Sequence, residues 1–177
     1  MFGMLLINFL YLLIHGWEIM GNITIDYFGN KKNFAKEIAD IWVHEWSNGY
    51  SKEKAKDQFE YNTECYSTNK PPFILVAHKG NELLGTVALY LNELDSRPKL
   101  DIWLGSLYVK NNYRSKGIAK QLISKVIEKA KDLGYKKIYL KTKDAQGYFE
   151  KQGWHHLEST IDNFSWPIDI YYIKITH

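Results

Sequence analysis

The sequence predicts a single α/β domain, because its length suits one core and its segments alternate between strand-like and helix-like periodicity. A chain of 177 residues lies within the usual size range of one domain. Hydrophobic residues make up 45% of the chain and charged residues 24%, so the disordered, collagen-like and coiled-coil classes are excluded. The sequence contains no internal repeat, low-complexity run or linker, which favours one domain.

The first half predicts a strand, two helices and a pair of strands. Residues from Asn22 alternate like a strand. Asn33 can cap a helix whose apolar residues recur at helical spacing, and Ser51 can cap a second helix that ends before Pro71. Residues 73–91 then predict two strands joined by a Lys-Gly-Asn turn.

The second half begins with a predicted strand from Leu100 to Val109. The longest helix follows, because apolar residues form one stripe from Ile118 to Leu133 with charged residues opposite, and Gly134 stands where a helix C-cap belongs. The remaining segments predict a strand, a short helix and a closing strand, at residues 136–142, 145–152 and 169–176.

The first 19 residues form an apolar extension with three interpretations. Their apolar run suits a signal-peptide core and is too short for a standard membrane span. However, no Lys or Arg precedes the run and no Ala-x-Ala-like cleavage site follows it. Translation starting at Met20 is the favoured interpretation, because the codons for Trp17 and Glu18 form a purine-rich run that could bind the ribosome. We therefore expect residues 20–177 to form the domain.

The net charge and the cysteine content limit the binding partners and the cellular compartment that the sequence favours. The net charge of +3 is too small to indicate bulk nucleic-acid binding, although lysine and arginine are concentrated between Lys110 and Lys143. Cys65 is the only cysteine, so an intramolecular disulfide and an all-cysteine zinc site are excluded. We expect a cytoplasmic protein with neither a nucleic-acid nor a membrane partner.

The turn between Val109 and the longest helix is a candidate anion site. A helix start presents unpaired N–H groups and the positive end of the helix dipole, and Gly117 lets a ligand approach the backbone closely. Arg114, Lys116 and Lys120 add positive charge. The two common nucleotide-binding glycine motifs are missing from this turn. A plain connection without a ligand is the alternative interpretation.

Three motifs in this order resemble the GCN5-related N-acetyltransferase (GNAT) family over residues 22–176. Arg114, Gly117 and Ala119 match its [Arg/Gln]-x-x-Gly-x-[Gly/Ala] signature, and Leu107 and Val109 match the Leu-x-Val end of the preceding strand. The downstream FEKQGW approximates Tyr-x-x-x-Gly-[Phe/Trp]. The resemblance implies a single N-acetyltransferase domain at residues 20–177, with a mixed, mostly antiparallel central sheet and helices on both faces.

The resemblance also implies acetyl-coenzyme A as co-substrate, without a metal. The acetyl group would pass to a primary amine of a small molecule or peptide by direct attack in a ternary complex. The amide of Val109 would polarise the thioester carbonyl. The strand end would pair with the pantetheine arm through Leu107, Tyr108 and Val109. The turn would hold the pyrophosphate through Arg114, Ser115, Lys116, Gly117, Ile118 and Ala119.

The general base is not given by the resemblance. Histone-modifying relatives carry a glutamate where Trp103 stands here, and tryptophan cannot take a proton. Asp101 is the first candidate, because it lies two residues earlier on the same strand face. The next candidates are Glu93 and Asp95 in the preceding loop and Glu45 on the first helix. A solvated charge is the alternative for each.

The acceptor side in this family is built from the first two helices. Glu45 and Tyr50 lie off the apolar stripe of the first helix and are candidates for amine binding. Trp42 and Trp46 lie on the stripe and are expected in the core.

The short helix raises the question of the general acid. The family's tyrosine protonates the departing thiolate, but alignment on Gly153 and Trp154 places Phe149 at that position, against the coenzyme. Neighbouring helical residues point about 100° apart, so Tyr148 is the acid only if the helix is rotated. We predict Tyr148 as the acid. The alternative is departure without an acid, since an unperturbed thiol has a pKa of about 8.5.

Two other functions stay open from the sequence. A non-catalytic coenzyme A sensor is favoured by the missing glutamate and the displaced tyrosine. An RNA-directed acetyltransferase or RNA-binding module rests on the basic segment alone, which coenzyme A phosphates already explain.

Overall fold

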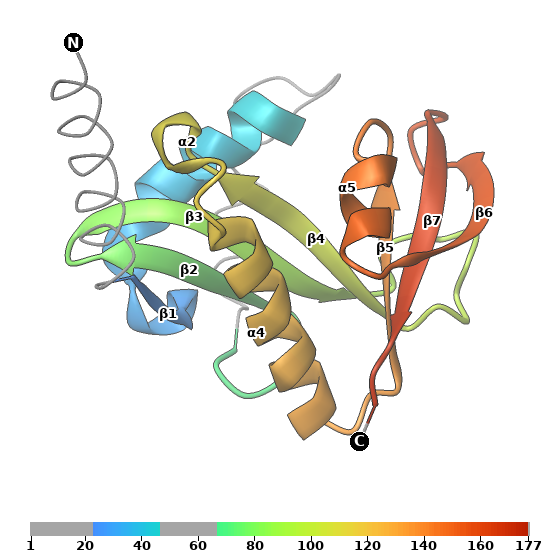
Figure 1. Cartoon of the computed structure of the whole chain (residues 1–177), viewed down its shortest axis with the longest axis horizontal. Helices are drawn as coiled ribbons and strands as arrows, with labels where there is room; N and C mark the ends of the chain where they lie inside the picture. The colour runs from blue at the N-terminus through green and yellow to red at the C-terminus, as the bar shows by residue number, and fades with distance from the viewer. Residues whose placement is uncertain (1–22, 47–66, 177) are drawn as a thin grey trace, which may run out of the picture.

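A computed structural model of the chain describes residues 23–46 and 67–176, and a seven-stranded sheet forms the centre of these residues (Figure 1). The strand order is β1-β2-β3-β4-β5-β7-β6, and only the β4–β5 pair is parallel among the pairings of this sheet. The predicted mixed, mostly antiparallel sheet is therefore confirmed. Its strands are β1 Thr24–Tyr27, β2 Phe73–Lys79, β3 Glu82–Leu91, β4 Ile102–Val109, β5 Lys137–Thr142, β6 His155–Ile161 and β7 Pro167–Lys174.

Helices cover both faces of the sheet, as predicted. Residues of β2 alternate between two core clusters: Leu75 packs with the cluster that contains α4 and α5, whereas Val76 packs with the cluster that contains α2. Figure 1 shows α4 lying across the strands. The α-helices are α2 Ala35–Trp46, α4 Ile118–Asp132 and α5 Gln146–Lys151, with short 3₁₀ turns η1 Phe28–Asn30, η2 Lys32–Phe34 and η3 Asn111–Tyr113.

The apolar stripe of α4 forms the largest helical contribution to the core. Ile118, Leu122 and Val126 are each at most 1% exposed. Burying one such aliphatic side chain contributes roughly 1.5–3 kcal/mol. Gly134 has φ +83°, and the N–H of Tyr135 donates to the carbonyl of Ala130, so the helix ends in the glycine C-cap that the sequence predicts.

Some boundaries differ from the predicted ones because local hydrogen bonds form turns. Asn33 lies inside η2 and does not cap α2, which begins at Ala35. The strand expected from Leu100 begins at Ile102, since the N–H of Leu100 donates to the carbonyl of Arg97 and closes a turn. The closing strand begins at Pro167, two residues earlier than predicted. The predicted helix after Ser51 lies outside the described residues.

The two parallel strands separate soon after they meet. β4 and β5 pair only at Trp103 and Tyr139, and Figure 1 shows them diverging toward their C-terminal ends. The later residues of β4 therefore have no neighbouring strand on the β5 side. In the described part of the chain, every helix is too short or too polar to cross a bilayer.

Candidate active site

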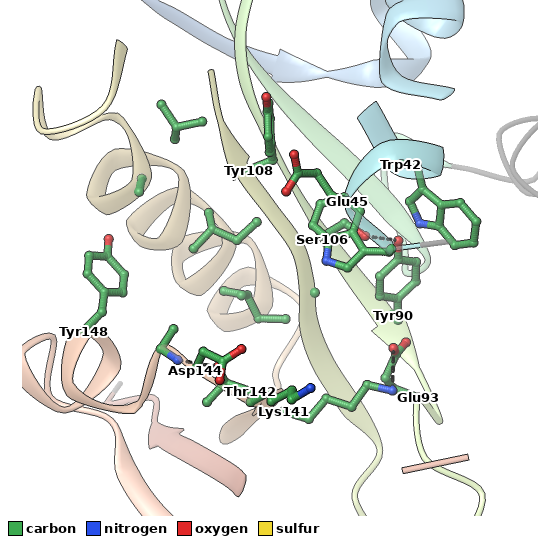
Figure 2. A pocket seen from close by; sticks show the side chains of 18 of the residues that line it. Trp42, Glu45, Tyr90, Glu93, Ser106, Tyr108, Lys141, Thr142, Asp144 and Tyr148 are labelled. Carbon is green, nitrogen blue, oxygen red and sulfur yellow. Dashed lines mark hydrogen bonds and ion pairs between the residues drawn. The ribbon is translucent and has the colours of Figure 1, made fainter. Parts of the chain in front are cut away.

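A cavity of about 1540 Å³ occupies the opening between β4 and β5. Its walls come from the end of β4, the turn into α4, the start of α5, the end of α2 and the tip of the β6–β7 hairpin. Figure 2 shows Tyr148 at one side of this cavity and Glu45, Tyr90 and Glu93 at the other, with β4 between them. The cavity thus brings together residues that lie far apart in the sequence.

The turn into α4 is shaped to bind an anion. Ser115 and Gly117 both have left-handed φ angles, +61° and +78°, which aligns successive N–H groups as a concave nest. A Cβ built on Gly117 would meet no atom within 4 Å, so the space beside it is open. The first N–H groups of α4 have no partner within the helix. This turn fits the predicted site for the pyrophosphate.

Two basic side chains of the turn support its backbone. The guanidinium of Arg114 donates from Nε to the carbonyl of Val109 at 2.9 Å, which ties the turn to the strand end. Lys116 Nζ donates to the carbonyl of Asn112 at 2.9 Å and does not line the cavity. Arg114, Ser115, Gly117, Ile118, Ala119 and Lys120 do line it.

The free edge of β4 fits an extended ligand. Leu107, Tyr108 and Val109 line the cavity and have no β5 partner. Directly before them, Ser106 has φ +49° and lies in a bulge of the β3–β4 ladder. The Ser106 carbonyl accepts a hydrogen bond from Thr86 Oγ1 at 3.1 Å. The Ser106 hydroxyl forms a hydrogen bond with the Tyr90 hydroxyl at 2.8 Å. These contacts hold a strained serine at the centre of the cavity wall.

Tyr148, and not Phe149, faces the cavity. Phe149 is 7% exposed and packs edge-on against Trp154, with ring centroids 5.9 Å apart. It does not line the cavity, so its expected place against the coenzyme is not supported. Tyr148 is 37% exposed and lines the cavity. Partial burial raises the pKa of its phenol, which keeps the hydroxyl protonated and able to donate.

The candidate carboxylates divide between the cavity and the surface. Glu93 lines the cavity and forms an ion pair with Lys141 at 3.3 Å. Glu45 also lines it, with its carboxylate 3.0 Å from the ring of His44. Asp101 is exposed and does not line the cavity, so the structure does not support the prediction that it is the base.

Asp101 does not reach the cavity because the face of β4 that it would share points into the core. Trp103, which shares its strand face, is fully buried and donates from Nε1 to the carbonyl of Leu100. That face therefore points into the core, among Leu94 and Ile170, and Asp101 lies one residue before β4 begins at Ile102.

Aromatic residues on the acceptor side were not expected there. Trp46 is 36% exposed, lines the cavity and lies edge-on to Tyr108, so the expectation that it is a core residue is wrong. Trp42, also on α2, packs against the core cluster that this helix covers and lines the cavity as well. The signal for this role was the spacing of Trp42, Glu45 and Trp46, which places them on one helix surface. Tyr50 lies outside the described residues.

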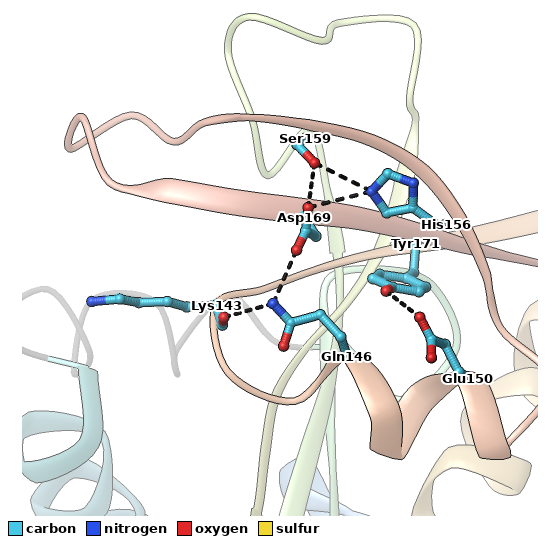
Figure 3. Close-up of polar contacts among 7 residues, drawn as sticks. All are labelled: Lys143, Gln146, Glu150, His156, Ser159, Asp169 and Tyr171. Carbon is cyan, nitrogen blue, oxygen red and sulfur yellow. Dashed lines mark hydrogen bonds and ion pairs between the residues drawn. The ribbon is translucent and has the colours of Figure 1, made fainter.

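A polar network fastens α5 to β7 (Figure 3). Gln146 Nε2 donates both to Asp169 Oδ2, at 2.9 Å, and to the carbonyl of Lys143, at 2.8 Å. Hydrogen bonds, first from Ser159 and then from Gln146, lower the pKa of the Asp169 carboxyl. At the other end of α5, Glu150 accepts a hydrogen bond from the Tyr171 hydroxyl at 2.8 Å and raises the pKa of Tyr171 to about 12.

The Ser159, His156 and Asp169 side chains are not a nucleophilic triad. Ser159 and Asp169 both approach the same atom, His156 Nε2, at 3.4 and 3.3 Å. A triad needs the carboxylate on Nδ1 and the hydroxyl on Nε2. Within residues 23–46 and 67–176, no group of three or more His, Cys, Asp or Glu is placed to hold a metal ion.

Comparison with known sequences identifies the family to which this chain is similar. A profile of the acetyltransferase (GNAT) family matches residues 19–154. N-acetyltransferase 8 of Rattus norvegicus is 31% identical over 131 residues, which cover 71% of this chain and 58% of the rat protein. N-acetyltransferase 8 of Mus musculus is 29% identical over 130 residues, which cover 71% of this chain and 57% of the mouse protein. The chain thus spans little more than half the length of these curated relatives.

Solved structures share the fold. An aminoglycoside 6'-N-acetyltransferase complexed with coenzyme A is similar at a TM-score of 0.69 and 16% identity, over 87% of this chain and 98% of its own. A GNAT-family acetyltransferase from Staphylococcus aureus Mu50 is similar at a TM-score of 0.65 and 21% identity, over 87% of this chain and 99% of its own. The turn into α4 and the free edge of β4 lie within the region matched by the family profile. The chain therefore belongs to the acetyltransferase (GNAT) family.

Proposed function

We propose that this protein transfers the acetyl group of acetyl-coenzyme A to a primary amine of a small molecule or peptide. The observation that carries the proposal is the cavity itself. An anion-binding turn and a free strand edge form one part of it, and the phenol of Tyr148 and the carboxylates of Glu45 and Glu93 line the rest. Bound acetyl-coenzyme A would supply an activated thioester, and the remaining steps belong to side chains of this chain.

Co-substrate binding is assigned to two backbone elements. The N–H groups from Arg114 to Ala119 would hold the pyrophosphate, with Lys120 adding charge. The edge of β4 at Leu107, Tyr108 and Val109 would hold the pantetheine arm by strand-like pairing. The Val109 amide would orient the carbonyl for attack. Phe149 is left out of this assignment because it lies in the core.

Proton transfer is assigned to the side chains that line the cavity. Glu93 would take the proton of the attacking amine, directly or through water, and Glu45 would hold the amine in place. Tyr148 would donate its phenolic proton to the departing thiolate. Asp101 is left out because it does not line the cavity. The reaction is direct attack within a ternary complex, so positioning supplies most of the rate enhancement.

A screen of amines for coenzyme A release tests the function. Purified protein would be mixed with acetyl-coenzyme A and with polyamines, aminoglycosides, amino acids or peptides that have free N-termini, and free thiol would be followed with time. At least one acceptor should give turnover that Glu93→Gln lowers, because the glutamine cannot take a proton. Tight coenzyme A binding without turnover for any amine would instead indicate a non-catalytic sensor.

The domain boundary and the compartment belong to the same proposal. We propose that residues 20–177 are the folded unit and that the protein acts in the cytoplasm. A chain beginning at Met20 retains every described element, so it should be soluble and bind acetyl-coenzyme A as tightly as the full chain does. Aggregation of the shorter chain, or recovery of the full chain in membranes, would contradict this.

A further inference from the structure

We propose that the cavity contains a second cation-binding subsite on the indole ring of Trp166, and that Lys143 occupies this subsite until a dicationic acceptor displaces it. The inference rests on the proposed function and names the acceptor class. Lys143 Nζ lies 4.5 Å from the centroid of the Trp166 ring, and both residues line the cavity. A cation over a tryptophan face is attracted by the ring quadrupole.

Trp166 is held in an exposed position by a rigid turn. Its side chain is 46% exposed, although a tryptophan ordinarily gains by burial. Asp162 Oδ1 accepts the N–H groups of both Phe164 and Trp166 at 2.9 Å, and the Asp162 N–H donates to the carbonyl of Trp166. Asn163 Oδ1 accepts the N–H of Asp95 and ties the hairpin tip to the β3–β4 loop. The ring is therefore preorganised at the cavity rim.

The main chain of Lys143 is equally fixed, whereas its side chain is not. The carbonyl of Lys143 accepts a hydrogen bond from Gln146, which Asp169 holds in turn. Figure 3 shows the Lys143 side chain extending away from this network. The network therefore positions Lys143 at the cavity, and its side chain reaches from there to the Trp166 ring.

Lys141 and Lys143, two of the three lysines that line the cavity, differ in their partners. Lys141 is paired with Glu93 at 3.3 Å. By contrast, among the described residues Lys143 has no carboxylate within 4.0 Å, and the Trp166 ring is its recorded partner. Exchange of the Lys143 ammonium for a ligand ammonium on the same ring replaces one cation–π contact by another. That exchange leaves the number of cation–π contacts unchanged, and the cavity that receives the ligand's positive charge is also lined by four carboxylates, those of Glu45, Glu93, Asp144 and Asp162.

The geometry therefore favours an acceptor with two amino groups. One amine must reach the opening of β4 beside Tyr148 as a neutral nucleophile, and the second, protonated amine would lie on Trp166. A diamine and a peptide whose free N-terminus is followed by lysine both offer this chemistry. The shared feature is an ammonium group a few bonds from the reacting amine.

Steady-state kinetics on four variants tests the subsite. The probes are 1,4-diaminobutane, the matched monoamine 1-aminobutane, and an N-terminally free peptide with lysine at its second position. The variants are Lys143→Met, Trp166→Leu, the double variant and the control Lys151→Met, which removes an exposed lysine of α5 that does not line the cavity.

Lys143→Met should lower the diamine-to-monoamine ratio of KM by about two- to fivefold, the range of one exposed cation–π contact. Trp166→Leu should raise this ratio, and adding Lys143→Met to Trp166→Leu should have no further effect on it. The control should not change it. The same pattern with the peptide, and not with 1,4-diaminobutane, would identify a peptide acceptor.

Three results would overturn the inference. In the first, Lys143→Met changes KM for the diamine and the monoamine equally, which indicates a general charge effect. In the second, Lys143→Met raises KM for acetyl-coenzyme A several-fold, which indicates that Lys143 holds a coenzyme phosphate. In the third, Lys143→Met changes the diamine-to-monoamine ratio of KM as strongly in the Trp166→Leu variant as in the wild-type protein. Calorimetric binding of 1,4-diaminobutane to the same variants needs no turnover, so a failure of the proposed reaction would not be mistaken for a failure of the subsite.

Discussion

Removing the hydroxyl of Tyr148 isolates its chemical role from its structural one. The side chain is 37% exposed, and within the described part of the chain its recorded contact is the edge-on ring of Phe149, 5.3 Å away. Tyr148→Phe keeps that ring contact, so the free energy of unfolding should change by less than about 0.5 kcal/mol. A lost general acid, by contrast, costs about 10²-fold in kcat, or about 2.7 kcal/mol of transition-state stabilisation.

The assay is kcat for coenzyme A release with saturating amine and acetyl-coenzyme A, measured from pH 7 upward. Burial raises the pKa of Tyr148 above 10, so the phenol stays protonated below that pH. The ratio of wild-type to variant kcat should therefore remain near its full value up to about pH 10 and shrink above it, as wild-type Tyr148 ionises. The KM for acetyl-coenzyme A should change little.

Exchanging the two rings provides the matched control. Phe149 is in the core, so a hydroxyl at this position would be buried beside Trp154 without an evident partner. The double variant Tyr148→Phe with Phe149→Tyr should thus stay as slow as Tyr148→Phe and melt at a lower temperature. The reasoning is refuted if Tyr148→Phe is nearly as fast as wild type, because the thiolate then leaves without an acid.

Two further predictions concern the turn and the network below α5. Gly117→Val places a β-branched residue at φ +78°, strained by roughly 1–2 kcal/mol, and fills the open space beside the turn, so calorimetry should show lost acetyl-coenzyme A binding by a protein that still melts cooperatively. Unchanged affinity would contradict the pyrophosphate assignment. Asp169→Asn should destabilise the protein above about pH 4, because hydrogen bonds from Ser159 and Gln146 lower the folded-state pKa of this carboxyl. Its contribution is lost as pH falls through that lowered pKa. A difference in melting temperature between the two proteins that does not shrink as the pH is lowered below about 4 would contradict the assignment.

The order of elements could be predicted because each element carries a local pattern. The stripe of α4 and its Gly134 cap are contiguous, and the structure reproduces both. The boundaries that differ, at Asn33 and Leu100, depend on turn hydrogen bonds to specific carbonyls. Such bonds leave no periodic signal in the sequence.

The candidate site also has one part that a local sequence pattern predicts and one part that depends on the folded structure. The phosphate turn is one short segment, so its glycine and its basic residues can be recognised together. The proposed acceptor side combines Glu45 from α2, Glu93 from the β3–β4 loop and Trp166 from the β6–β7 hairpin, which line one cavity. Their proximity is created by the sheet and by the separation of β4 from β5, neither of which the spacing of residues reveals. Strand alternation predicts Asp101 as the base, but Asp101 lies one residue before the observed strand begins.

Core packing, and not the position of a residue in the family motif, determines which ring of α5 faces the cavity. Because neighbouring helical residues point about 100° apart, burying Phe149 against Trp154 turns Tyr148 toward the cavity. Gln146 and Glu150 then hold α5 to Asp169 and Tyr171 of β7, near both ends of the helix. The helix has six residues and makes few backbone bonds of its own, so these contacts largely determine its rotation. The phenol therefore reaches the cavity from position 148 because the ring of Phe149 fills the core.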